Sequence, residues 1–312
     1  MYNVKVLWSY KEVPLSPVIL VHHAAGRGTG RPANSLGALR VCLDGRAQAI
    51  EVDVQPLGDG DFALLHDPLL ERATTGHGPV GAATAAQVAG LQLLWKGAPS
   101  QERVALLSQV VELVRGLEVP AELQLDLKAH AAAPLTDERL QQLARLIEPL
   151  GQRVRVSTIA DWALRRLHAL APQVPLGFDP LLYLDVRSDD DEDAPPYRVG
   201  AYGYHDDHPL AAVRWGEARS YLALRAEALW QQAPMAGVWY IRASTLARAL
   251  DDGYDWIAGL HARGALVDAW TLDASEPAQV ELARRLVRAG VDRITTNDPP
   301  ALAQTLRGDV AY

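Results

Sequence analysis

Short apolar runs alternate with longer segments of helical periodicity along most of this chain. Runs of β type are predicted at residues 17–23, 49–54, 123–128, 153–157, 174–178, 237–241, 266–271 and 292–295. Between them, apolar residues recur at spacings of three and four, as at Leu140, Leu143, Ala144 and Ile147, and this spacing is typical of amphipathic helices. Repeated alternation of strand and helix with short connections favours a closed parallel barrel, the (β/α)₈ or TIM barrel, over an open doubly wound sheet.

Two segments interrupt this alternation. Residues 62–66 form an additional short strand or extended loop directly after the second predicted strand. Residues 179–235, between the fifth and sixth predicted strands, are much longer than an ordinary connection, and a loop of that length in a compact domain is usually functional or disordered. We therefore expect one barrel domain over residues 1–312, with residues 179–235 as an insertion or lid within it.

The second predicted strand carries two acidic residues among its apolar ones. Glu51 and Asp53 are two positions apart, so the period of a strand turns both side chains to the same face. Carboxylates are costly in an apolar strand unless a metal ion or another cation compensates them. Because the following run ends in His66, two acidic groups and an imidazole can meet above the ends of neighbouring strands. This arrangement is typical of metal-assisted hydrolases.

Net charge, cysteine content and hydropathy limit the partners and the cellular compartment that we expect for this chain. The formal net charge of the 312-residue chain is −8 and no extended basic stripe is present, which argues against nucleic acid as the main partner. Cys42 is the only cysteine, so no disulfide can form within the chain. No apolar run reaches the ~18 residues of a membrane span, and the N-terminal segment lacks the apolar core of a secretory signal. We therefore expect a cytoplasmic protein without stable membrane association, and the oligomeric state stays open.

Several short motifs follow one another in a specific order: Val21-His22-His23, Pro32-Ala33-Asn34-Ser35, Ile50-Glu51-Val52-Asp53-Val54, Leu65-His66-Asp67-Pro68, Leu125-Asp126-Leu127-Lys128 and Ala269-Trp270-Thr271. The series resembles the glycerophosphodiester phosphodiesterase family over about residues 18–128 and again from residue 237 to the end. The resemblance implies a (β/α)₈ barrel and a divalent cation, Mg²⁺ or Ca²⁺, held by carboxylates. It also implies hydrolysis of a small phosphodiester to a phosphomonoester and an alcohol.

Individual residues of these motifs acquire roles through the same resemblance. Glu51 and Asp53 match the paired metal ligands of the family, and Asp126 falls where the family usually has a glutamate. The shorter carboxylate still offers the oxygen ligands that Mg²⁺ and Ca²⁺ prefer. His23 and His66 match two histidines that exchange protons with the phosphodiester and with its leaving group.

Three further assignments each leave an alternative open. His22 could take the place of His23, which is preferred because it ends the predicted strand. Lys128 would lie near the substrate phosphate as a point charge, but it could instead be a structural ion-pair partner of Asp126. Trp270 matches a position that lines the family's pocket, and it could equally belong to the core.

Departures from the family pattern concentrate near the first histidine. The family usually continues with Arg-Gly, where this chain has Ala24-Ala25, and Ala33 replaces a usual glutamate. Loss of that arginine removes a guanidinium that could bind phosphate in bidentate fashion. We therefore expect Arg27 or Arg31 to supply the missing positive charge to the substrate. Late in the chain, Asn297 stands in a Thr-Asn-Asp-Pro sequence where Thr-Asp-x-Pro is more usual.

Two functions of different class follow from these residues. In the first, the chain is a metal-dependent enzyme that hydrolyses glycerophosphodiesters or a related small phosphodiester of lipid metabolism, with two histidines as acid and base. In the second, it is a catalytically weak or inactive barrel that binds a phosphorylated ligand, because the arginine and glutamate near the first histidine are absent. Retention of both histidines favours the enzyme. An amidohydrolase is a remoter alternative, since that class needs more histidine ligands than the predicted strands offer.

Overall fold

The last parallel strands of this chain return to its first strand and close a ring. The computed structural model describes residues 17–26, 28–116, 121–130, 133–184, 217–306 and 310–311. The ring strands are β1 (Val18–His22), β2 (Ala49–Pro56), β6 (Glu122–Leu127), β7 (Val154–Thr158), β8 (Leu176–Phe178), β9 (Ala236–Arg242), β10 (Leu266–Trp270) and β11 (Arg293–Thr296). They follow the order β1-β11-β10-β9-β8-β7-β6-β2, and pairing of β1 with β2 closes the ring. The predicted (β/α)₈ barrel is confirmed, and the open doubly wound sheet is ruled out.

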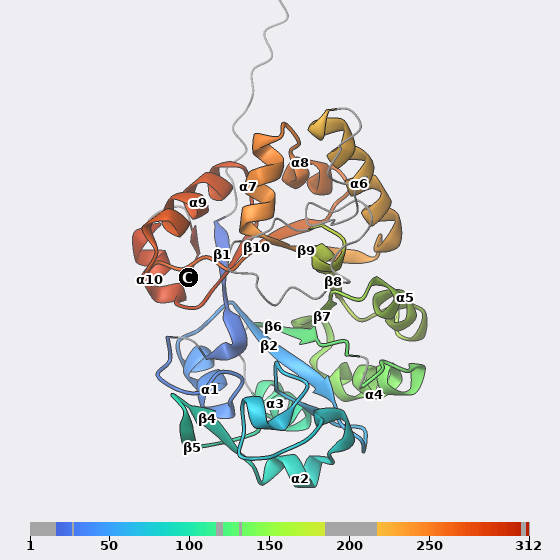
Figure 1. Cartoon of the computed structure of the whole chain (residues 1–312), viewed down its shortest axis with the longest axis vertical. Coiled ribbons are helices and arrows are strands. Elements are labelled where there is room, and N and C mark those ends of the chain that lie inside the picture. Colours follow the sequence, from blue (N-terminus) through green and yellow to red (C-terminus); the bar gives the residue numbers. More distant parts are fainter. Residues whose placement is uncertain are drawn as a thin grey trace, which may run out of the picture.

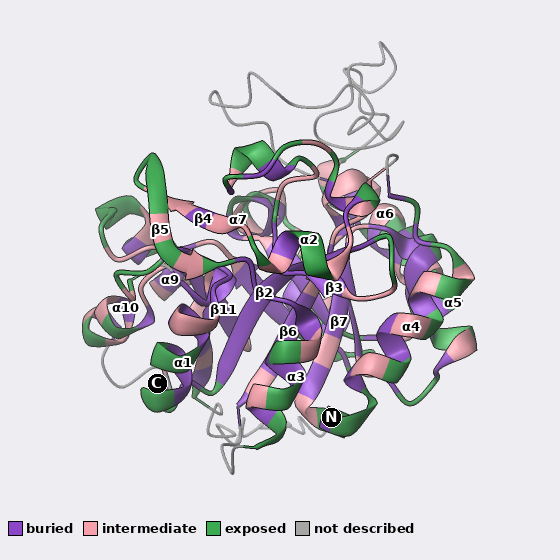
Figure 2. Ribbon diagram, turned by 90° about the horizontal axis from the view of Figure 1, so that it is seen from below, coloured by how far each residue is buried: buried purple, intermediate pink, exposed green. Residues whose placement is uncertain are grey.

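Helices cover the outer face of the barrel (Figure 1). They are α1 (Leu36–Asp44), α3 (Leu107–Arg115), α4 (Asp137–Ile147), α5 (Asp161–Leu170), α6 (Ala218–Gln232), α7 (Ala243–Asp251), α8 (Trp256–His261), α9 (Pro277–Arg288) and α10 (Pro299–Thr305). In α4 the predicted apolar stripe is buried, and in Figure 2 the strands are buried while the outer sides of the helices are exposed. None of the helices in the described ranges has the length and hydropathy that a membrane span requires.

An excursion between β2 and β6 forms a small unit with its own apolar core. It contains β3 (Phe62–Ala63), the 3₁₀ turns η2 (Leu70–Arg72) and η3 (Val80–Ala82), the helix α2 (Ala85–Ala89), and the hairpin of β4 (Gln92–Trp95) and β5 (Ala98–Arg103). Residues 62–66 were predicted as a short strand or an extended loop, and of these only Phe62 and Ala63 pair with β2. The hairpin was not predicted, since β5 is polar, largely exposed and shows no apolar alternation.

The segment predicted as an insertion, residues 179–235, contributes one helix to the barrel wall. Its first residues form the 3₁₀ turn η5 (Pro180–Leu182), and its last part is α6. Trp230 of α6 stacks on Trp239 of β9 with 6.0 Å between ring centroids, and Phe178 meets the same indole edge-on at 5.0 Å. The helix α6 thus packs between β8 and β9 as an ordinary barrel helix. Residues 185–216, the larger part of the predicted lid, lie outside the described residues.

Charged residues fill the end of the barrel interior where the strands begin. The carboxylate of Glu122 on β6 binds the guanidinium of Arg293 on β11, with Nη1 2.6 Å from Oε1, and that of Arg155 on β7, with Nε 3.2 Å from Oε1. Burial opposes ionisation of Glu122, but the two guanidinium groups outweigh it and lower its pKa to about 2. This ion-pair network closes the barrel end opposite to the expected working face.

Asp268 on β10 makes the stability of the barrel depend on pH. The side chain is 0% exposed, and burial raises its pKa to about 6 although Arg293 and the Thr295 hydroxyl favour the charged form. Stability from a raised carboxyl pKa is fully present below the unfolded pKa and is lost as the pH rises through the folded value. Relative to Asp268→Asn, the wild type should therefore lose up to about 3 kcal/mol of unfolding free energy between about pH 4 and about pH 7.

Denaturant unfolding of both proteins across that pH range measures this difference. Asparagine keeps an oxygen that can accept the hydrogen bond of Thr295, which is 2.9 Å long in the wild type. Parallel stability curves for the two proteins would show that Asp268 does not change protonation on folding.

Candidate active site

Three carboxylates converge at the carboxyl ends of two neighbouring barrel strands. Asp53 of β2 is the register partner of Asp126 of β6, and Glu51 lies two residues earlier on the same face of β2. One oxygen from each of the three carboxylates lies within 4.8 Å of the others. Glu51 and Asp53 are only 8% and 3% exposed. The structure thus brings together the three residues that the sequence suggested as metal ligands.

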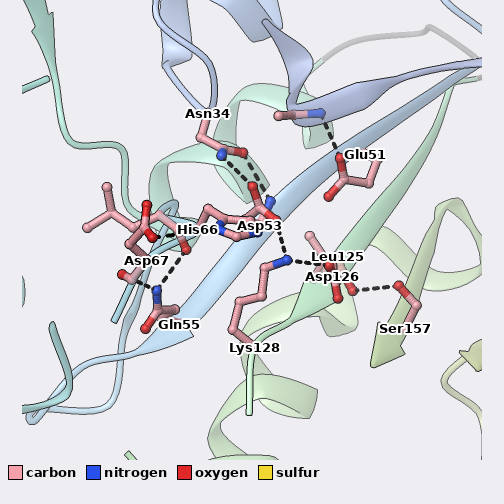
Figure 3. Close-up of polar contacts among 12 residues, drawn as sticks. Asn34, Glu51, Asp53, Gln55, His66, Asp67, Leu125, Asp126, Lys128 and Ser157 are labelled. Carbon is pink, nitrogen blue, oxygen red and sulfur yellow. Dashed lines mark hydrogen bonds and ion pairs between the residues drawn. The ribbon is translucent and has the colours of Figure 1, made fainter. Parts of the chain in front are cut away.

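A lysine joins this acidic cluster, as Figure 3 shows. The Nζ atom of Lys128, directly after β6, lies 2.7 Å from Asp53 Oδ1 and 2.6 Å from Asp126 Oδ2. Burial disfavours the ammonium, but the carboxylates of Asp126 and Asp53 outweigh it and raise the pKa of Lys128. Burial likewise opposes the charge of Asp53, whose pKa is nevertheless lowered by Lys128 and His66. Lys128 is therefore a fixed positive charge within the cluster.

The net charge of the cluster is suited to a divalent cation. Three carboxylates against one ammonium leave two negative charges when all groups are ionised. Burial raises the pKa of Glu51 well above its ordinary value, and the charges of Asp53 and Asp126 add to this shift. Glu51 Oε1 and Asp126 Oδ1 have no hydrogen-bond partner among the described residues. The donor set, all carboxylate oxygen, fits hard cations such as Mg²⁺ or Ca²⁺.

The turn after β1 orients Glu51 through the backbone. Ala24 and Ala25 have φ angles of 50° and 48°, in the left-handed region, which costs an L-residue roughly 1–2 kcal/mol. This conformation directs the Ala24 N–H at Glu51 Oε2, with 2.6 Å between the two atoms. The sequence has Ala24-Ala25 where the family usually has Arg-Gly. In the structure this turn orients Glu51 of the acidic cluster through the Ala24 N–H.

Asn34 orients Asp53 from the opposite side. Its Nδ2 donates to Asp53 Oδ2 at 2.7 Å, and its Oδ1 accepts from the Asp53 backbone N–H at 3.0 Å. The N-cap of α1 is the next residue, Ser35, whose side chain accepts from the Ala38 N–H. The sequence analysis named Asn34 within a motif but gave it no role. The one available signal was its place in the Pro32-Ala33-Asn34-Ser35 motif.

The strand β1 ends at His22, one residue earlier than predicted, and the adjacent His22 and His23 make different contacts. His22 is buried towards α1, with its Nδ1 3.4 Å from Cys42 Sγ, and burial lowers its pKa to about 4. His23 comes directly before Ala24, the residue that binds Glu51, and its Nδ1 lies 2.8 Å from Asn297 Oδ1. These contacts direct His22 towards α1 and His23 towards the residue after β11.

Asn297, directly after β11, is itself held by Asp273. Its Nδ2 donates to Asp273 Oδ2 at 2.6 Å, and its backbone N–H donates to Asp273 Oδ1 at 2.8 Å. The Thr296 hydroxyl also donates to Asp273 Oδ1, at 3.2 Å. Sequence reasoning noted Asn297 only as a departure from the family pattern and missed Asp273, for which the chain offers no local signal.

His66 lies on the loop after β3, beside the acidic cluster. Its imidazole is 66% exposed, its Nδ1 is 3.9 Å from Asp67 Oδ1, and it is close enough to Asp53 to help lower the pKa of that carboxyl. The side chain of Gln55 on β2 holds the loop by donating to the carbonyl oxygens of Leu65 and Asp67 (Figure 3). A solvent-accessible imidazole therefore lies next to buried carboxylates.

His130, two residues beyond Lys128, is a third histidine near the cluster that sequence reasoning missed. Burial lowers its pKa, and the positive charges of Lys128 and His66 add to the effect. Its Nε2 is buried and has no hydrogen-bond partner among the described residues. Its position two residues after the Leu125–Lys128 motif was the signal available in the sequence.

An arginine and a tryptophan lie at the mouth of the barrel, on the wall opposite the acidic cluster. Arg242 and Trp270 end β9 and β10 and are register partners, on the same inward face as the partner pair Tyr240 and Asp268. The Arg242 guanidinium lies over the Trp270 ring, 5.0 Å from its centroid. In the ring order, β9 is separated from β2 by three strands on either side, so this pair faces the acidic cluster across the barrel.

The sequence suggested Arg27 or Arg31 as the source of positive charge for the substrate, and the structure describes only Arg31. Arg31 forms an ion pair with Glu102 of β5, in the excursion, and not with any residue of the acidic cluster. Arg27 lies outside the described residues. Arg242 was missed because nothing in the linear sequence relates the end of β9 to the motifs near the first histidine.

The fold and this site define a (β/α)₈-barrel hydrolase that works at the carboxyl ends of its strands. The model of the glycerophosphoryl diester phosphodiesterase family matches residues 25–301, and the chain belongs to this family. It is a phosphoric diester hydrolase, as the resemblance implied, and the matched range also runs across residues 179–235.

A named relative agrees with this assignment, and solved structures share the fold. The chain is 22% identical over 302 residues to a glycerophosphodiester phosphodiesterase of Caldanaerobacter subterraneus subsp. tengcongensis, covering 94% of this chain and 99% of the relative. An Oleispira antarctica phosphodiesterase, solved in complex with the product sn-glycerol-3-phosphate, superimposes with a TM-score of 0.63 at 20% identity, covering 93% of this chain and 97% of that one. A glycerophosphodiester phosphodiesterase of Agrobacterium tumefaciens gives a TM-score of 0.60 at 19% identity, covering 92% and 99%.

Proposed function

We propose that this enzyme is a metal-dependent glycerophosphodiester phosphodiesterase that releases a glycerol phosphate and an alcohol. The observation that carries the proposal is the cluster of Glu51, Asp53 and Asp126 beside Lys128. One carboxylate oxygen from each of the three lies within 4.8 Å of the others. The glycerol phosphate product named for the Oleispira antarctica structure supports the same class of substrate.

The residues in and around the cluster would have separate roles in phosphodiester hydrolysis: cation binding, phosphate binding and proton transfer. Glu51, Asp53 and Asp126 would hold a divalent cation, Mg²⁺ or Ca²⁺, which supplies charge neutralisation at the phosphate oxygens and activation of the attacking hydroxyl group. Lys128 adds a point charge for the same oxygens. His23 and His66 transfer the protons: one accepts the proton of the nucleophile, and the other protonates the departing alcohol.

Metal removal tests the proposal directly. The purified protein is treated with chelator and assayed with glycerophosphocholine, glycerophosphoethanolamine and bis(p-nitrophenyl) phosphate, before and after addition of Mg²⁺, Mn²⁺ or Ca²⁺. We expect chelation to lower turnover at least about 100-fold, because a bound cation contributes several kcal/mol of transition-state stabilisation. Cation binding without turnover of any diester would favour the phosphate-binding barrel, and turnover that resists chelation would contradict metal dependence.

We also propose that Arg242 supplies to the substrate the positive charge that was expected from Arg27 or Arg31. Its place on the inward face of β9, stacked on Trp270, supports a contact with the substrate phosphate from the wall opposite the carboxylates. Arg242→Ala should raise KM about 10- to 100-fold, since a charge-assisted hydrogen bond contributes roughly 1.5–3 kcal/mol. Arg103→Ala, which alters an exposed arginine of β5, is the matched control. Equal KM values in the two variants would exclude Arg242 from substrate binding.

A further inference from the structure

We infer that Asn297, oriented by Asp273, holds His23 in the tautomer that carries its proton on Nδ1, so that Nε2 is the nitrogen that can exchange a proton in the reaction. The inference rests on the proposed function for its catalytic meaning. Its structural part stands on a chain of contacts that links three loops at the mouth of the barrel. These loops follow β10, β11 and β1, which are neighbours in the ring.

The direction of each hydrogen bond in this chain follows from its first member. The carboxylate of Asp273 can only accept, so the group of Asn297 that lies 2.6 Å from Asp273 Oδ2 must be its NH₂. The other amide atom, the carbonyl oxygen, then faces His23 Nδ1 at 2.8 Å. Because that oxygen also only accepts, Nδ1 must carry a hydrogen. A neutral imidazole has one N–H, so its Nε2 is the basic nitrogen.

Asp273 is well placed to resist rotation of the amide. Its Oδ1 accepts from the Asn297 backbone N–H at 2.8 Å and from the Thr296 hydroxyl at 3.2 Å. Its own backbone N–H donates to Gln279 Oε1 at 2.7 Å. Turning the Asn297 amide by half a turn would set two oxygens, from Asn297 and Asp273, against each other. Asp273 and Asn297 are therefore positioning residues that act through His23 and do not touch the reacting atoms.

With this tautomer, the reaction balances when His23 acts as the base and His66 as the acid. The O–H bond of the attacking water or substrate hydroxyl breaks, its proton passes to His23 Nε2, and a new P–O bond forms. The P–O bond to the alcohol breaks, and the leaving oxygen takes a proton from the second histidine, His66. His66 is exposed and has no comparable amide partner among the described residues, so it can exchange its proton with solvent between turnovers.

The tautomer can be measured without turnover, in protein labelled with ¹⁵N in its histidine rings. Two-bond ¹H–¹⁵N correlation spectra at a pH well above the ordinary histidine pKa of ~6.5 distinguish the two neutral tautomers. We expect the His23 signals, identified by their loss in His23→Asn, to report hydrogen on Nδ1. His261 is an internal reference for the opposite tautomer, because its Nε2 lies 2.8 Å from the carboxylate oxygen Oδ2 of Asp292.

Two variants then test the role of the amide. Asn297→Ala and Asp273→Ala should give His23 a mixture of tautomers and lower kcat about 10- to 100-fold, as loss of an orienting partner commonly does, with KM nearly unchanged. The His261 signals should not change.

Contrary outcomes separate this inference from the proposed function. Hydrogen on His23 Nε2 in the wild type overturns the inference even if the enzyme is active, and the spectrum of the wild type decides this without any variant. An unchanged kcat in Asn297→Ala overturns the positioning role. If the wild type has hydrogen on His23 Nδ1 but hydrolyses no phosphodiester, the inference that Asn297 orients His23 stands and the proposed function is wrong.

Discussion

Replacing Glu51 with glutamine is expected to lower kcat about 1,000-fold while leaving the fold intact. The substitution keeps the shape of a buried side chain and removes one of the three carboxylates that we propose as cation ligands. A cation contributes several kcal/mol to the stabilisation of a phosphoryl transition state, and each 1.4 kcal/mol corresponds to about a tenfold change in rate. Rates of glycerophosphocholine hydrolysis at saturating Mg²⁺ measure the effect, with Glu138→Gln, an exposed residue of α4, as the control.

The same variant should have the opposite effect on the stability of the metal-free protein. Burial and the neighbouring charges of Asp53 and Asp126 raise the pKa of Glu51, so the ionised side chain destabilises the fold without a cation. Stability from such a group is lost as the pH rises through the folded pKa, and glutamine removes this loss. In chelator at neutral pH, Glu51→Gln should therefore unfold at a higher temperature than the wild type. Binding isotherms should show weaker Mg²⁺ affinity, and unchanged affinity would exclude Glu51 as a ligand.

Replacing His66 with alanine should reduce the hydrolysis of glycerophosphocholine by about 10²- to 10⁴-fold, the usual contribution of a general acid. The imidazole is 66% exposed, so its removal should not disturb folding or cation binding. The loss should be much smaller with bis(p-nitrophenyl) phosphate, because p-nitrophenolate leaves without needing a proton. This difference between leaving groups tests whether His66 is the acid.

The matched control for this experiment is His168→Ala, which alters an exposed histidine on the outer helix α5. Comparable losses with both substrates would exclude His66 as the acid and would instead suggest a role in binding or in proton abstraction. A His66→Ala enzyme with nearly full activity towards both substrates would remove His66 from the mechanism.

Local periodicity explains why the barrel and its acidic face were predictable. Eight strands were recovered within a few residues, because each is an apolar run of limited length between helical patterns. The alignment of Glu51 with Asp53 depends only on the period of a strand, which any two residues of one segment obey. The polar hairpin of β4 and β5 escaped prediction because its stability comes from its place in the excursion and not from its own pattern.

The sequence by itself determined the order of strands and helices, the family and the three carboxylates, since these are local or near-local properties of the chain. Only the tertiary structure decided which side chains complete the site. His23 meets Asn297 across 274 residues, and Arg242 meets Trp270 because β9 and β10 are adjacent in a closed ring. Arg31, near the first histidine in sequence, is instead held by Glu102. Closure of the barrel brings distant strand ends together, and no pattern within a single segment encodes that neighbourhood.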